Sequence, residues 1–123
     1  MIVQEKTGGI YQQIAEYGIE QVLSGDWSAG DRIPSVRQLA AEVGVNPNTV
    51  MSAYEQLKHL EVIETRRGLG FFVADEGRSA ALSLRRRRFI DEELPRLRRA
   101  LDLLSISPTE LQTLLFPEEQ SEN

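Results

Sequence analysis

Four arginines lie in stretches of the sequence that carry no aspartate or glutamate, and guanidinium groups bind phosphate through charge-assisted hydrogen bonds. The stretches are residues 32–41, 44–54 and 65–74, and the arginines are Arg32, Arg37, Arg66 and Arg67. The whole chain of 123 residues nevertheless has a net charge of −5. The sequence therefore predicts an acidic protein with a small positive face that suits nucleic acid, and with weak non-specific affinity for it.

Two short helices are predicted to position the first two stretches. Ser35 and Gln38 form a capping box, which predicts a helix directly after Ser35, and Gly44 suits the end of that helix. Asn46 is a good N-cap, and Pro47 fits the first turn of a second helix. This spacing indicates a helix-turn-helix, with an αα-corner in an unrelated helical domain as the alternative. Backbone N–H groups at the starts of both helices are expected to bind phosphate.

A β-hairpin is predicted after the second helix. Residues 62–66 alternate apolar and polar, and residues 71–73 form a second β-prone run. Gly68 and Gly70 supply the backbone freedom that the connection needs. Because two arginines lie at its tip, the hairpin is interpreted as the wing of a winged helix-turn-helix. That fold puts one helix into the major groove of DNA and the wing against the neighbouring backbone.

Ahead of these elements, apolar residues at helical spacing predict a helix over residues 10–24 that ends at Gly25. Gly18 lies on its apolar side, which costs about 1 kcal/mol relative to alanine unless another backbone packs closely there. Trp27 and Ile33 are expected to close the core.

A narrow apolar stripe follows the wing and indicates a helix that pairs with another helix. Its residues are Phe89, Ile90, Leu94, Leu97, Leu101 and Leu104. Ser107, Pro108 and Glu110 then form the start of a second helix that runs to Phe116, ahead of a polar end. The predicted fold class is mainly α with a small β-hairpin, in two domains. Residues 1–75 form the winged helix-turn-helix, and residues 76–123 form a two-helix dimerisation tail.

Two features of the tail have alternative interpretations. The run Arg85–Arg88 is either an auxiliary arm for DNA or a solvated face, and pairing with the acidic residues that follow it favours the second. Pro95 should kink the helix after Leu94, either as a simple bend or as a functional hinge.

Five segments occur in the order and at the spacings of a known family. They are Ile10–Ile14, Gly25–Ala40, Gly44–Val50, Ala53–Tyr54 and Gly68–Val73. They resemble the N-terminal domain of GntR-type bacterial transcription factors, and the short tail is similar to that of the YtrA-type members, which pair through it as homodimers. The resemblance implies operator contacts at Arg37, Asn46, Asn48, Thr49, Arg66, Arg67 and Gly68. We expect Ser35 to join Arg37 on the DNA backbone.

Three positions depart from the family pattern. Glu61 replaces a usual glycine before the wing, Leu69 replaces a usual polar residue at its tip, and Met51 stands where many members carry arginine.

The sequence shows no pattern for catalysis, a metal or a cofactor, so an enzyme is not predicted. The single histidine, His59, is expected at the surface, and Asp26 and Asp31 are expected to hydrogen-bond turns rather than bind calcium. No apolar run is long enough to span a membrane, and with no cysteine in the chain we expect a cytoplasmic location.

The predicted function is that of a homodimeric transcriptional repressor whose partner is double-stranded DNA with an inverted-repeat operator. The alternative is a helical protein–protein interaction module that does not bind DNA. The sequence specifies neither the operator, the regulated genes, nor an effector.

Overall fold

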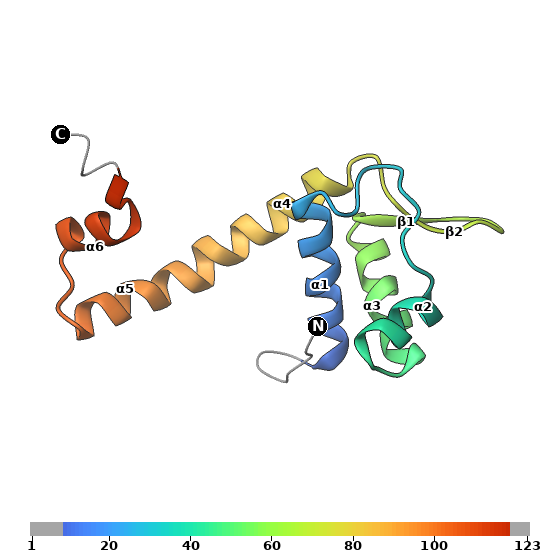
Figure 1. The fold of residues 1–123 in the computed structure, drawn as a ribbon, viewed down its shortest axis with the longest axis horizontal. Helices are drawn as coiled ribbons and strands as arrows, with labels where there is room; N and C mark the ends of the chain where they lie inside the picture. Colours follow the sequence, from blue (N-terminus) through green and yellow to red (C-terminus); the bar gives the residue numbers. More distant parts are fainter. Residues whose placement is uncertain (1–8, 119–123) are drawn as a thin grey trace. The chain divides into compact units, whose positions relative to one another are not determined.

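A computed structural model describes residues 9–118 of the chain (Figure 1). In chain order its elements are α1 (Ile10–Ser24), α2 (Val36–Val43), α3 (Pro47–His59), β1 (Ile63–Arg66), β2 (Gly70–Val73), α4 (Gly77–Arg88), the π-helical turn η1 (Phe89–Glu93), α5 (Leu94–Leu103) and α6 (Pro108–Leu115). These residues divide into two compact units, one ending at Leu84 and the other beginning at Arg85. The predicted fold class is confirmed. No helix within the described part of the chain has the length and apolar character needed to cross a membrane.

Side-chain caps determine where α2 and α3 begin. The N–H of Gln38 donates to Ser35 Oγ at 3.1 Å and the N–H of Ser35 donates to Gln38 Oε1 at 2.8 Å, so the predicted capping box is confirmed. Gly44 ends α2 with φ 75°, also as predicted. Asn46 caps α3, and Pro47 occupies its first turn. The tight turn that results packs α2 against α3.

The end of α3 is a Schellman motif whose left-handed residue is Glu61, with φ 66°. The N–H of Val62 donates to the C=O of Leu57 at 2.9 Å, and the N–H of Glu61 donates to the C=O of Lys58 at 3.0 Å. Because Val62 completes this cap, β1 begins one residue later than predicted. A residue with a Cβ here carries strain that glycine would not.

The hairpin pairs β1 with β2 in an antiparallel register that runs from Ile63 opposite Val73 to Arg66 opposite Gly70. Ile63 and Val73 are buried, which anchors the base of the hairpin in the core. Gly68 has φ 75° and Gly70 has φ 114°, so the predicted need for glycine at both positions is confirmed.

Tyr54 lies at the centre of the first unit and is completely buried. Its O–H donates to the C=O of Pro34 at 2.7 Å, and its ring packs edge-on against Phe71 with 4.9 Å between centroids. Burial raises the pKa of the Tyr54 hydroxyl above its ordinary value, with smaller effects from Tyr17 and Glu42. One side chain thereby links α3 to the segment before α2 and to β2.

Close approach explains the glycine inside α1. A Cβ at Gly18 would lie 2.7 Å from Leu57 Cδ1, so the close neighbour of this glycine is a side chain of α3 rather than another backbone. Trp27 and Ile33 are buried as predicted.

The loop between α1 and α2 is held by its own carboxylates. Asp26 Oδ2 accepts the O–H of Ser24 at 3.0 Å, and Asp31 Oδ2 accepts the N–H of Ser28 at 2.9 Å. The predicted role of both aspartates in turn hydrogen bonds is confirmed.

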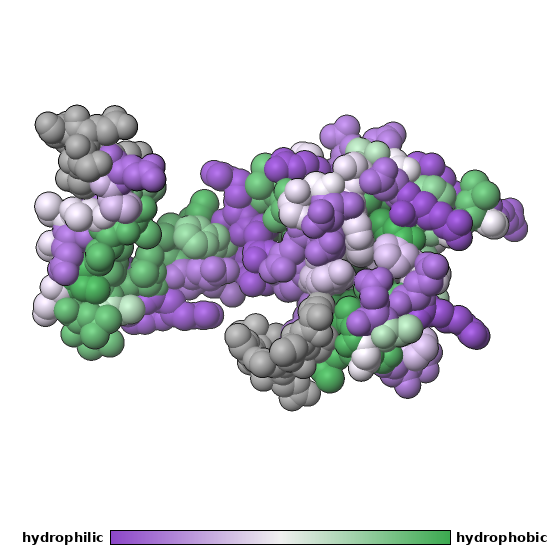
Figure 2. All heavy atoms as spheres, viewed as in Figure 1, coloured by the Kyte–Doolittle hydropathy of each residue, from purple (hydrophilic) through white to green (hydrophobic). Residues whose placement is uncertain are grey.

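The beginning of α4 also packs on the first unit. Ala81 is completely buried, and a Cβ at Gly77 would overlap the C=O of Val62. No side chain in residues 85–118 is buried, in contrast. Apolar side chains gather instead on the exposed surface of the α5 and α6 segment (Figure 2).

Pro95 lies in the first turn of α5, directly after η1. The N–H of Leu94 donates to the C=O of Phe89, five residues back, so a π-helical turn directly precedes the position at which a kink was predicted. Arg88 Nε lies 3.6 Å from Glu93 Oε2, which confirms intrahelical pairing for this arginine. The predicted polar end, residues 119–123, lies outside the described residues.

Tyr54→Phe should lower the free energy of unfolding by about 0.5–1.5 kcal/mol, because the C=O of Pro34 loses its donor in a partly buried site. Urea unfolding of both proteins at neutral pH measures the difference. An unchanged midpoint and slope would show that water replaces the hydroxyl.

The same pair should differ at alkaline pH. Tyr54 keeps its proton in the folded chain but loses it in the unfolded chain near its ordinary pKa of 10.0, so wild-type stability should fall as the pH rises above that value. The loss should approach about 1.4 kcal/mol per pH unit for this group and be absent from Tyr54→Phe. Parallel pH profiles of the two proteins would contradict this.

Glu61→Gly should raise the free energy of unfolding by about 1 kcal/mol, because glycine relieves the left-handed strain at the end of α3 while adding some freedom to the unfolded chain. Glu61→Ala is the matched control, since it removes the same charge and keeps the strain. Thermal melting of the wild type and both variants measures the difference. Equal increases in stability in both variants would assign the effect to the lost charge rather than to relieved strain.

Candidate nucleic-acid interface

The start of α3 presents two polar side chains. Asn48 is exposed and Thr49 is half-buried. The N–H of Asn48 donates to Asn46 Oδ1 at 2.7 Å, so the cap occupies the backbone of Asn48 and leaves its side-chain amide available. Such an amide offers one donor and one acceptor, which match the major-groove edge of adenine.

Backbone N–H groups at this helix start are not available to phosphate, so the prediction for α3 was wrong. Pro47 has no N–H, and that of Asn48 is bonded to the Asn46 side chain. The N–H of Thr49 donates to the C=O of Asn46 at 2.9 Å. Asn46 therefore acts mainly as the cap of α3, and its side-chain amide nitrogen is left to donate to DNA.

The start of α2 differs, because its capping box satisfies only the third N–H of the helix. Helix geometry leaves the N–H groups of Val36 and Arg37 without an intrahelical acceptor, so both are suited to phosphate. Ser35 Oγ accepts the N–H of Gln38 and retains its own hydroxyl hydrogen as a donor. The Arg37 side chain is exposed.

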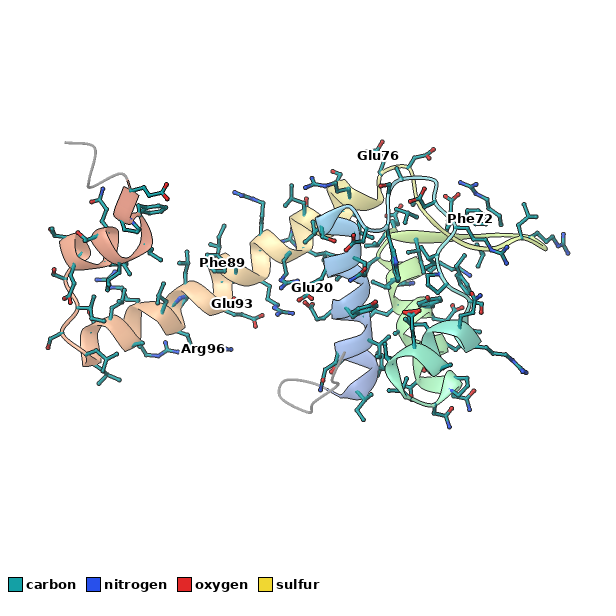
Figure 3. The ribbon with its side chains drawn as sticks, in the orientation of Figure 1. Glu20, Phe72, Glu76, Phe89, Glu93 and Arg96 are labelled. Atoms are coloured by element: carbon teal, nitrogen blue, oxygen red, sulfur yellow. The ribbon has the colours of Figure 1, made fainter. Side chains whose placement is uncertain are left out.

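The tip of the hairpin carries the other predicted contacts. Arg67 and Gly68 are exposed in the turn, next to the exposed side chain of Leu69. Arg66 is more constrained: its Nε lies 3.0 Å from Glu64 Oε2, and its Cζ lies 4.2 Å from the ring centroid of Phe72, labelled in Figure 3. Neither contact was predicted.

All eight predicted DNA-binding residues therefore lie in the first unit, at three places that Tyr54 connects through the core: the start of α2, the start of α3 and the hairpin tip. Arg32, the remaining arginine of the predicted positive face, forms an antiparallel bridge with Phe72 beside the wing. A bridge across 40 residues leaves no local signal in the sequence.

The residues predicted to mediate dimerisation lie in the second unit. Their fractional exposures are Phe89 45%, Ile90 50%, Leu94 40%, Leu97 40% and Leu104 68%, and Leu101 is half-buried. Residues 85–118 have no core of their own, and this apolar stripe is exposed to solvent. A stripe of this kind is typical of a surface that packs against another protein segment.

A helix-turn-helix followed by an antiparallel hairpin with arginines at its tip defines a winged helix-turn-helix. Residues 10–73 match the model of the gntR family of bacterial regulatory proteins. The chain belongs to this family of DNA-binding transcriptional regulators.

The predicted similarity to YtrA regulators is also confirmed. The chain is 41% identical over 70 residues to the transcriptional repressor YtrA of Bacillus subtilis, an alignment that covers 57% of this chain and 54% of that protein. The chain spans about half the length of the curated relatives it matches.

Two solved structures extend the similarity into the tail. A putative GntR regulator from Bacteroides thetaiotaomicron is 40% identical with a TM-score of 0.71, over 94% of this chain and 100% of that one. YtrA from Sulfolobus acidocaldarius is 30% identical with a TM-score of 0.57, over 85% of this chain and 98% of that one.

If Asn48 reads a base, Asn48→Ala should cost about 1–3 kcal/mol at one base position only. Arg37→Ala should instead weaken binding to all sequences alike and flatten its salt dependence, because a phosphate contact carries no base information. Titration of both variants against single-base variants of a bound duplex separates the two roles. Unchanged base preference in Asn48→Ala would exclude that residue as a reader.

Proposed function

We propose that this chain is a homodimeric repressor that recognises an inverted-repeat operator. The observation that carries the proposal is the exposed polar start of α3, next in sequence to a hairpin with two arginines at its tip. In this model α3 enters the major groove, with Asn48 and Thr49 near base edges. Ser35, Arg37 and Asn46 bind the DNA backbone, and Arg66–Gly68 lie against the adjacent backbone or minor groove.

Dimerisation is assigned to the tail because its apolar stripe has no cover within its own unit. Leu94, Leu97 and Leu101 follow one another at helical spacing and share a side of α5. A second copy of the same helix is the natural cover, as in other helical pairs. Two-fold symmetry of the protein then implies two-fold symmetry of the DNA site.

The repressor role is proposed from the similarity to Bacillus subtilis YtrA, which is named a transcriptional repressor. We place its action in the cytoplasm, where the bacterial chromosome is found.

Selection of bound sequences from a random duplex library tests the proposal. The wild-type chain should enrich two inverted copies of one half-site at fixed spacing. Leu97→Asp combined with Leu101→Asp places charge in the apolar stripe and should yield a monomer that enriches single half-sites. Its affinity for the paired site should fall by about 10²–10⁴, because the second contact is no longer intramolecular.

Arg99→Asp is the matched control. It makes the same change in net charge as the double substitution but lies two residues from both leucines, on the other side of α5. Sedimentation should find this control dimeric. A doubly charged variant that remains dimeric would remove the tail from the model, and a wild-type chain that enriches no sequence would favour the protein–protein interaction module.

A further inference from the structure

The segment just before α2 runs along the outer edge of the hairpin. The N–H of Ile33 donates to the C=O of Phe71 at 3.0 Å, and Arg32 forms an antiparallel bridge with Phe72. Residues opposite one another in an antiparallel pair project to the same face. The side chains of Arg32 and Phe72 therefore share one face of the hairpin sheet.

Arg66 reaches the same face from the other strand. It lies opposite Gly70, which is two residues before Phe72 on β2 and so belongs to that face. A Cβ at Gly70 would lie 3.3 Å from Arg32 Nε and 3.5 Å from Arg32 Nη2. Gly70 therefore leaves room for the Arg32 guanidinium on the face that Arg66 and Phe72 share.

The two arginines differ in whether a carboxylate neutralises their charge. Arg66 is paired with Glu64 and stacked on Phe72, whereas Arg32 is exposed and forms no ion pair within residues 9–118. The side chains of Arg66 and Glu64 are 38% and 42% exposed, so water screens their ion pair and keeps it weak. An incoming anion can displace the carboxylate.

We propose that Arg32 and Arg66 together form a binding site for the phosphate backbone of operator DNA, and that Glu64 occupies Arg66 until DNA replaces it. The proposal rests on the function proposed above and adds Arg32 as a contact. Planar guanidinium groups match phosphate oxygens with two parallel hydrogen bonds. The ring of Phe72 holds the Arg66 guanidinium in place while one anion replaces another.

DNA fits this face better than an acidic protein segment does. The face belongs to the hairpin that directly follows the recognition helix, so phosphates beside the reading site come within its reach. It also offers two cations beside one aromatic ring, which suits a chain of anions.

Salt-dependent titration of the full chain against a bound duplex tests the site. Arg32→Ala should reduce the slope of log affinity against log salt by about one for each bound protomer, and the affinity by about tenfold per protomer near 0.1 M salt. Arg32→Lys should retain most of the slope but less of the affinity, because an ammonium group keeps the charge and cannot make the two parallel hydrogen bonds. Lys58→Ala removes the same charge from the exposed last turn of α3, far from Asn48, and should behave as wild type.

The role of Glu64 is tested by coupling. Glu64→Gln should raise the affinity severalfold, most at low salt, because Arg66 loses its competing anion. The gain should vanish in the Arg66→Ala background. An equal gain in both backgrounds would reduce Glu64 to a general repulsive charge and overturn its proposed hold on Arg66.

Three other results would overturn the site. If the wild type binds DNA and Arg32→Ala matches it in affinity and slope, the face does not bind phosphate, and an acidic protein segment becomes its candidate partner. Weaker binding with an unchanged slope, or a lower melting temperature, would make Arg32 a structural residue. Failure of the wild type to bind any duplex would overturn the proposed function and this site together.

Discussion

The buried side chain of Tyr54 fixes the parts of the winged domain relative to one another. It belongs to α3, donates its O–H to the C=O of Pro34 just before the cap of α2, and packs its ring against Phe71 of β2. A DNA reader must hold its helix and wing in one register, because base edges and phosphates are at fixed spacings along the duplex. In this fold the fully buried ring of Tyr54 and its one hydrogen bond help to hold the helix and the wing in that register.

Local signals in the sequence were sufficient to predict the helices and most of the candidate site. The caps at Ser35 and Asn46 connect residues two or three positions apart, so their geometry follows from residue types. The prediction of a phosphate site at the start of α3 was wrong for an equally local reason. Pro47 lacks an N–H, and oxygen atoms of Asn46 accept the N–H groups of the next two residues, Asn48 and Thr49. Capping and phosphate binding compete for the same donors, and here the cap of α3 takes them.

Contacts between distant residues could not be predicted. Nothing near Arg32 in the sequence indicates that it lies beside Gly70, and nothing near Gly77 indicates that the C=O of Val62 excludes a Cβ there. The π-helical turn before Pro95 is an intermediate case, because proline predicts a disrupted helix without specifying its form. The position of Arg32 beside the wing therefore depends on the tertiary fold.

The two units differ in where their stability originates. The first has a continuous buried core, whereas residues 85–118 bury no side chain and present apolar ones. In the proposed dimer, covering this stripe stabilises the paired state by a free energy that grows with the logarithm of the concentration of free chain, so order in the tail and pairing of the readers become one equilibrium. A chain with a net charge of −5 and a small positive face binds DNA weakly through one reader. In the proposed dimer, pairing then decides whether the protein occupies a site, because long-range attraction to DNA contributes little and the proximity of the second reader contributes most.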